Sequence, residues 1–220
     1  MLNLLFPHTC AGCLDVLFDG EKILCVECRH RLPLVSHHKT GNEVLKNKFY
    51  GRFPLKNATA LLEFQKKGLT QELLHQLKYR GQKEISSFFG EWLGAELAEH
   101  HSYKEIEMVI PVPLHKQKLK KRGYNQVEGF GKEIAKALNI PYRDDILIKI
   151  SKTGTQVFKT RILRFEAEEV FAIQNLDQIH DKHILLVDDI ITTGATLEQC
   201  AVQLLKAEKV KLSIATIAVA

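Results

Sequence analysis

The sequence predicts an α/β fold, a mostly parallel sheet with helices on both faces, preceded by a small cysteine-rich unit. The first observation behind this prediction is the regular alternation of short apolar runs with helical periodicity from Ile106 onward, which is typical of parallel sheets. The second is that four of the five cysteines fall within the first 28 residues. A chain of 220 residues, 45% of them hydrophobic, is long enough for one main domain and a small accessory unit.

The elements of the main domain can be placed in order along the chain. The run ATALLEF (58–64) is strand-like, and apolar residues at helical spacing predict helices over 69–77 and 85–97. The rest of the chain is predicted to alternate between strands and helices, with one basic loop. In chain order they are EMVIPV (107–112), a basic loop (116–122), a helix (126–138), DILIKI (145–150), HILLVDD (183–189), a helix from 196, and VKLSIATIAV (210–219). Because ligands of such sheets bind beyond the carboxyl ends of the strands, the residues after EMVIPV and HILLV are the candidates for a site.

The N-terminal cysteines have the spacing of a structural zinc site. Two CxxC pairs stand eleven residues apart, and each pair can aim two thiolates at one point, which together supply a tetrahedral set. The predicted ligands are Cys10, Cys13, Cys25 and Cys28. Two disulfides or a redox CxxC are the alternatives, disfavoured by a reducing cytoplasm and by the duplication respectively. His8 and His30 lie nearby, but the set is complete without them, and metal binding is expected to contribute the folding free energy of this short segment.

The remaining bulk features indicate an ordinary cytoplasmic protein. The N-terminus lacks the basic region, the long apolar stretch and the small-residue cleavage site of a signal peptide, and no apolar run approaches the roughly 20 residues of a membrane span. A net charge of +5 is too small to indicate a nucleic-acid binder by itself. Cys200 lies on the apolar face of a predicted helix and is expected to be a buried packing thiol.

Two adjacent acids, Asp188 and Asp189, close the apolar strand HILLVDD. Burying two unpaired carboxylates is costly, so the strand is expected to end there, at a wet crevice or beside cations. The next residues offer hydroxyl groups, a glycine and the free N–H groups of a helix start, which together suit a phosphate. They are Thr192, Thr193, Gly194, Ala195 and Thr196. Carboxylates just upstream can bind sugar hydroxyls or help to hold Mg²⁺, and the combination predicts a site for a phosphorylated ribose.

Two other interpretations of this stretch were weighed. Four apolar residues before two aspartates can form the metal-binding strand of an ATPase, but the chain has no GxxxxGK[ST] motif. A plain strand-to-helix turn with solvated acids accounts for the carboxylates, although not for the consecutive small and hydroxyl residues that follow.

A cluster of cations follows the strand EMVIPV. The candidates for ligand binding are Lys116, Lys120, Lys121 and Arg122, and Lys118 lies among them. Such a run is often solvated surface, but here it leaves a parallel strand on the side expected for the acids. Cations at that place can stabilise a departing pyrophosphate, and they can equally attract single-stranded DNA. The sequence leaves both uses open.

The stretch ILLVDDIITTGAT resembles the phosphoribosyl pyrophosphate (PRPP) binding motif of type I phosphoribosyltransferases. This resemblance implies that Asp188 and Asp189 act as the catalytic acids that contact the ribose hydroxyls. It also implies that residues 192–196 hold the 5′-phosphate and that Mg²⁺ accompanies PRPP.

The whole chain resembles ComF-type proteins, an N-terminal double zinc knuckle joined to a type I phosphoribosyltransferase-like domain. The resemblance is carried by LFPHTCAGC, CVEC, LLHQLKYRG, PVPLHKQKLKKRGYNQ, a TxxQ element (Thr153 and Gln156), Arg164 and the PRPP motif. It predicts a zinc-knuckle domain over 1–35 and the phosphoribosyltransferase-like domain over 57–220. The polar stretch between them, 36–56, has no periodicity and is expected to be a linker or hinge that can be partly helical, with His37 and His38 in a solvated loop.

The sequence departs from the family pattern between Lys149 and Phe171. Ala167 stands where the family has asparagine, Phe171 arrives one residue early, and lysines at 149 and 152 replace the usual basic residues before TxxQ. What this segment contacts is therefore left open.

Two hypotheses on function follow from the resemblance. The leading one is a cytoplasmic PRPP-binding protein linked to DNA uptake in natural transformation, working with a helicase partner and transferring phosphoribosyl to an acceptor that the sequence does not identify. The alternative is an accessory protein without catalysis that binds single-stranded DNA or the helicase, because a fold does not guarantee its chemistry.

Overall fold

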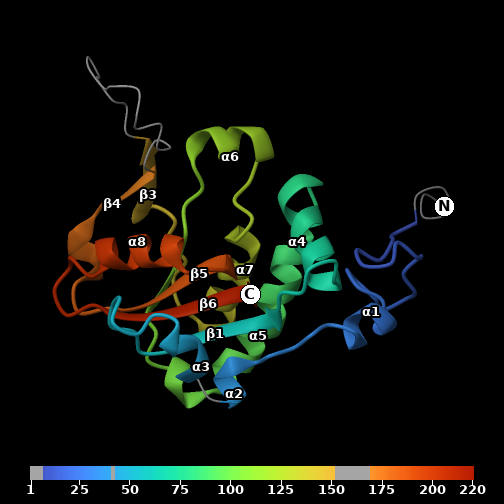
Figure 1. Cartoon of the computed structure of the whole chain (residues 1–220), viewed down its shortest axis with the longest axis horizontal. Helices are drawn as coiled ribbons and strands as arrows, with labels where there is room; N and C mark the ends of the chain where they lie inside the picture. Colours follow the sequence, from blue (N-terminus) through green and yellow to red (C-terminus); the bar gives the residue numbers. More distant parts are fainter. Residues whose placement is uncertain (1–6, 41–42, 152–168) are drawn as a thin grey trace.

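The structure is a computed structural model that describes residues 7–40, 43–151 and 169–220 (Figure 1). Its centre is a parallel four-stranded sheet in the order β1-β6-β5-β2. The strands are β1 (Ala58–Glu63), β2 (Met108–Pro111), β5 (His183–Ile191) and β6 (Lys211–Val219), and a separate antiparallel pair consists of β3 (Leu147–Ser151) and β4 (Glu169–Ile173). The predicted α/β fold with a parallel sheet is confirmed.

Helices cover both faces of this sheet. They are α1 (Val26–His30), α2 (His37–Thr40), α3 (Glu43–Asn47), α4 (Leu69–Tyr79), α5 (Glu84–Glu99), α6 (Lys116–Arg122), α7 (Glu128–Leu138) and α8 (Ala195–Leu204), with short 3₁₀ turns at His101–Tyr103 and Leu176–Ile179. Successive residues of β5 point to opposite faces, as the pleat of a strand requires. Leu185 and Val187 belong to the core that α5 and α7 cover, whereas Ile184 and Leu186 belong to the core under α8.

Cys200 lies in the core under α8. Its residue is fully buried, and burial raises the pKa of its thiol well above the usual value. The structure therefore confirms the prediction that Cys200 is a buried packing residue.

Two elements differ from the sequence prediction. The strand HILLVDD does not end at its acids: β5 continues to Ile191, and Asp188 lies in register with Thr216 of β6. The basic segment is not a loop but the helix α6. The ring of His115 accepts a hydrogen bond from the backbone N–H of Gln117 at its start, and Gly123, at φ 84°, ends it in the left-handed conformation. The lysines, glutamine and leucine between them favour helix, which explains the correction.

The histidine pair expected in a solvated loop also differs from the prediction. Helices α2 and α3 contact β1, and Leu45 and Phe49 are buried. His38 is 2% exposed, with its Nδ1 3.1 Å from Thr59 Oγ1 and its Nε2 3.1 Å from a carboxylate oxygen of Glu96. Burial lowers the pKa of His38 to about 4. The prediction of a solvated loop is wrong for His38 because α2, which carries it, packs on β1.

The cysteine-rich unit packs against α4 and α5. The side-chain amide of Gln76 donates to the carbonyl of Ala11 at 2.6 Å, and the guanidinium of Arg29 lies 4.8 Å from the ring centroid of Trp92. Cys10 and Cys28 share a core cluster with the leucines of α4. Figure 1 accordingly shows α1 beside these two helices at one end of the sheet. No helix in the described parts of the chain combines the length and apolarity needed to cross a membrane.

Helices α5 and α7 approach each other closely at Gly90. A β-carbon at this position would lie 2.6 Å from the carbonyl oxygen of Phe130 and 2.8 Å from its Cα, both backbone atoms that cannot rotate away. We predict that Gly90→Ala lowers the free energy of unfolding by about 1–3 kcal/mol, because overpacking outweighs the better helix propensity of alanine. Urea denaturation followed by circular dichroism measures this, with the exposed neighbour Glu91→Ala as the control. Equal or greater stability of Gly90→Ala would contradict the packing described.

Candidate functional site: a four-cysteine centre and an acid-lysine cavity

The four N-terminal cysteines meet at one point. Their sulfur atoms all lie within 4.8 Å of one another, and the Sγ atoms of Cys13 and Cys25 are 3.7 Å apart. Four sulfurs held about 2.3 Å from a tetrahedral zinc ion stand about 3.8 Å apart, so the donor set fits Zn²⁺. The structure thus supports a structural zinc site. When bound, the ion would supply the positive charge that allows four thiolates to share this space.

Backbone N–H groups are directed at these sulfurs. Gly12 and Cys25 each donate to Cys10 Sγ at 3.3 Å, and Cys28 donates to Cys25 Sγ at 3.4 Å. Burial by itself raises the pKa of Cys10, but these donors outweigh it and lower that pKa to about 7. For Cys28, burial and the neighbouring sulfurs raise the pKa. A cation is therefore what the cluster requires to hold all four as thiolates.

We predict one zinc ion per chain in protein purified without chelator. Cys13 is exposed, so Cys13→Ala removes a ligand with little loss of packing. Loss of an outer partner of a metal ligand already weakens binding about 10–100-fold, and loss of a ligand should cost at least as much. Elemental analysis and competition with a chromogenic chelator measure this, and Cys200→Ala, which lies in the other core, should keep full zinc. Full zinc at unchanged affinity in Cys13→Ala would contradict the assignment.

The second site is a cavity of 520 Å³ beyond the carboxyl ends of β5 and β2. These strands are neighbours in the sheet, so the segments that follow them, which lead to α8 and α6, open onto the same edge. The cavity is lined by acids, cations and aromatic residues from four parts of the chain. The polar and aromatic ones are Lys78, Tyr79, Lys118, Lys121, Arg122, Tyr124, Gln126, Lys149, Asp188, Asp189 and Thr196.

The two acids reach this cavity from within the sheet rather than from a loop. Asp188 is 8% exposed and Asp189 4%. Each has a specific partner: Asp188 Oδ1 accepts from the backbone N–H of Asp189 at 2.8 Å, and Asp189 Oδ2 lies 2.9 Å from Lys78 Nζ. Of the two environments expected for the acids, a wet crevice or a cation, the cation is present at Asp189, and both acids line the cavity.

The two carboxyl groups do not carry equal charge. Burial, followed by the negative charge of Asp189, raises the pKa of Asp188 to about 8, although Lys78 and Lys149 pull in the opposite direction. Asp189 forms the ion pair with Lys78. A carboxyl group with a pKa raised in this way can donate a hydrogen bond at neutral pH, which an ionised aspartate cannot do.

The residues after β5 form the TTGAT loop (192–196). Gly194 caps α8 in the left-handed conformation at φ 75°, and Thr193 Oγ1 accepts from the N–H of Ala195 at 3.4 Å. Of these five residues, Thr196 lines the cavity, whereas Gly194 is buried and Thr192, Thr193 and Ala195 are exposed outside its lining. The first turn of a ten-residue helix thus begins beside the acids, with N–H groups that have no partner within the helix.

The predicted cations divide between the cavity and the solvent. Lys121 and Arg122 line the cavity together with Lys118, whereas Lys116 and Lys120 are exposed on α6. A helix turns successive residues by about 100°, so all five could not face one cavity as a flexible loop would allow. Arg122 is also held in place, with its guanidinium 5.6 Å from the ring centroid of Tyr79 and a hydrogen bond to the side chain of Gln126.

Sequence reasoning assigned no role to Lys78, Tyr79, Tyr124 or Lys149, which also line the cavity. Lys78 and Tyr79 form the end of α4, within the stretch LLHQLKYRG, where a cation complements the helix dipole. The hydroxyl of Tyr124 donates to the carbonyl of Leu77, which ties this end of α4 to the segment after α6. The sequence signal that could have identified Lys78 and Tyr79 is their position at the end of a predicted helix, just before a glycine.

Part of the family pattern lies outside the described residues. This applies to Lys152, to Thr153 and Gln156 of the TxxQ element, to Arg164 and to Ala167. At the flanks of that segment, Lys149 Nζ lies 5.0 Å from the ring centroid of Phe171. Among the described residues, the four cysteines are the group of three or more acids, cysteines or histidines that could hold a metal ion. The structure therefore does not support a Mg²⁺ site made of such side chains in that part of the chain.

Comparisons with known proteins agree with the fold. The family model described as "Phosphoribosyl transferase domain" matches residues 128–220. The chain is 26% identical over 208 residues to "Competence protein ComFC" of Bacillus subtilis, covering 89% of this chain and 83% of that protein. It is 33% identical over 129 residues to "Competence protein ComFC" of Streptococcus pneumoniae, covering 59% and 54%.

A third relative is "DNA utilization protein YhgH" of Escherichia coli O157:H7, 27% identical over 138 residues. The match covers 61% of this chain, and the chain spans 60% of the length of that relative.

The parallel sheet and the family match define a protein with a phosphoribosyltransferase-like domain. Its four-cysteine cluster and its relatives support a more specific placement, in a ComF-like family.

The raised pKa of Asp188 predicts how stability depends on pH. The folded carboxyl keeps its proton up to about pH 8, whereas an unfolded aspartate loses it near its usual pKa of 3.8. The stabilisation that this group contributes is therefore complete below about pH 4 and is lost as the pH rises toward 8. Asp188→Asn cannot ionise, so its melting temperature should rise relative to the wild type between pH 5 and pH 8.5. A change of about 1 kcal/mol corresponds to about 2–4 °C for this chain length.

Differential scanning calorimetry without ligand provides the measurement. Asp177→Asn is the control, because the side chain of Asp177 is fully exposed. Melting curves for Asp188→Asn and the wild type that shift in parallel with pH would contradict the raised pKa.

Proposed function

We propose that the cavity binds a phosphoribosyl ligand of the PRPP type, and that the protein acts in DNA uptake as a phosphoribosyltransferase. The observation that carries the proposal is the convergence, in one cavity, of a buried acid pair, the start of α8 and cations from α4, α6 and β3. The phosphoribosyltransferase-like domain supports a phosphoribosyl ligand, and the similarity to two proteins named as competence proteins supports the link to competence.

Each part of such a ligand has a chemical counterpart. The 5′-phosphate suits the TTGAT loop, where backbone N–H groups and the helix dipole favour an anion. The ribose diol suits the acid pair, because protonated Asp188 donates and Asp189 accepts. The pyrophosphate suits Lys118, Lys121 and Arg122, which would stabilise the charge that develops as it leaves.

Lys78 is the counterion of Asp189 in the structure. In the absence of ligand it neutralises Asp189 at 2.9 Å. A ribose diol that bonds to Asp189 would compete with this contact and release the ammonium group toward the pyrophosphate. Mg²⁺ enters the proposal only with the ligand's pyrophosphate, whose charge it would partly neutralise.

The alternative function is an accessory protein, located like the leading candidate in the cytoplasm, that binds single-stranded DNA or a helicase without catalysis. It is favoured by α6, whose seven residues include five cations and no acid, and which projects from the body at the top of Figure 1. This surface suits a polyanion whatever happens in the cavity.

Titration of PRPP in the presence of Mg²⁺ tests the leading proposal. Isothermal titration calorimetry should detect binding to the wild type, and Asp188→Ala with Asp189→Ala should weaken it by at least about tenfold, since each variant removes hydrogen bonds to the diol. Asp177→Asn again serves as the control. Absence of PRPP binding, together with salt-dependent binding of single-stranded DNA that PRPP does not affect, would favour the alternative.

A further inference from the structure

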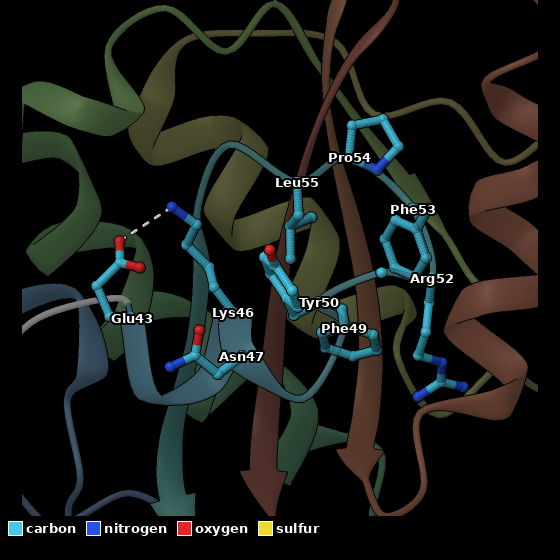
Figure 2. A pocket seen from close by; sticks show the side chains of 10 residues that line it. Glu43, Lys46, Asn47, Phe49, Tyr50, Arg52, Phe53, Pro54 and Leu55 are labelled. Carbon is cyan, nitrogen blue, oxygen red and sulfur yellow. Dashed lines mark hydrogen bonds and ion pairs between the residues drawn. The ribbon is translucent and has the colours of Figure 1, made fainter.

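Arg52, from the segment that the sequence predicts to be a linker, contacts the TTGAT loop from behind. Its Nη1 donates to the carbonyl oxygen of Thr193 at 2.8 Å, and its Nε donates to a carboxylate oxygen of Glu198 at 2.9 Å. Nη2 donates to the same carboxylate. One side chain thus joins residues 48–53 to both the loop and the first turn of α8. Arg52 is one of the residues of this segment that line a cavity of 610 Å³. In Figure 2 its side chain is directed away from Lys46 and Glu43.

Phe49 completes this support. A β-carbon on Gly194 would lie 2.5 Å from a ring carbon of Phe49, so the loop rests directly on that ring. The guanidinium of Arg52 lies over the same ring, 5.5 Å from its centroid. Phe49 is buried, so the surface that the loop rests on is fixed by the core.

The hydrogen bond to Thr193 sets the direction of an N–H group. The peptide between Thr193 and Gly194 is planar and trans, as are all those described. Its N–H therefore points away from its C=O. Because Arg52 holds the carbonyl oxygen, the N–H of Gly194 is directed away from Arg52.

The ion pair with Glu198 removes an unfavourable charge. Glu198 lies in the first turn of α8, where the proposed 5′-phosphate would approach, and two anions there would repel. The hydrogen bond from Arg52 lowers the pKa of Glu198, so this carboxylate stays ionised and paired.

We propose that Arg52 is a positioning residue for the 5′-phosphate: it orients the Thr193–Gly194 peptide and neutralises Glu198, without touching the ligand. The inference rests on the proposed function, because it presumes that the TTGAT loop receives a phosphate. It also gives the segment 43–55 a role in ligand binding.

The test uses the full chain and ribose 5-phosphate, with calorimetry as the readout. Arg52→Ala should weaken the binding of ribose 5-phosphate by about tenfold or more. This loss of affinity is expected when a charge-assisted pair and an oriented donor disappear together. Pyrophosphate with Mg²⁺, which lacks the 5′-phosphate, should bind Arg52→Ala as it binds the wild type. Arg52→Ala with Glu198→Gln should regain part of the loss, since the repelling charge is gone, and Arg52→Lys should be intermediate.

Lys46→Ala is the matched control, because it removes one cation from the same segment, where Lys46 pairs with Glu43 instead. Should Arg52→Ala fail to fold, Arg52→Lys, which keeps the charge, gives the comparison. Ribose 5-phosphate affinity within about twofold of the wild type in Arg52→Ala, an equal loss in Lys46→Ala, or a parallel loss of pyrophosphate binding would overturn the inference. A double variant as weak as Arg52→Ala would overturn the part assigned to Glu198. Failure of the wild type to bind either ribose 5-phosphate or PRPP would instead contradict the proposed function.

Discussion

The contact between Lys78 and Asp189 allows two neighbouring acids to sit inside a parallel sheet. Both residues are nearly buried at the end of β5, where two free carboxylates would be costly. The structure meets this cost in two ways: Asp188 keeps its proton, and Asp189 pairs with an ammonium group at 2.9 Å. The pair therefore has one donor and one acceptor, the combination that a sugar diol can use.

The elements around the cavity follow from this constraint. The last turn of α4 carries Lys78. The Tyr124 hydroxyl donates a hydrogen bond to this turn and so links it to the segment after α6. β3 brings Lys149 to the same cavity. The cysteine-rich unit packs on the same helix, through Gln76 and the leucines of its core cluster, so it supports the helix that supplies the counterion.

Much of this arrangement could be predicted from the sequence, and the successes share a local cause. The strands and long helices are encoded by periodicity, and the cysteine cluster by two-residue spacing, so neighbours along the chain suffice. The misses depend on contacts between distant residues. Lys78 meets Asp189 across 111 positions (189 − 78), and Arg52 meets Glu198 across 146. The segment 36–56 looked like a linker because its few apolar residues have no clear period, although Leu45 and Phe49 are buried. The continuation of β5 through its acids could not be foreseen without the lysine that makes it tolerable.

A crystal structure of the protein with Mg²⁺ and PRPP, or with ribose 5-phosphate, tests the central claim most directly. The account predicts the 5′-phosphate at the TTGAT loop, the ribose hydroxyls within hydrogen-bond distance of Asp188 and Asp189, and Lys78 Nζ displaced from Asp189. A phosphate bound only on the outer face of α6, with the contact between Lys78 and Asp189 intact, would contradict it.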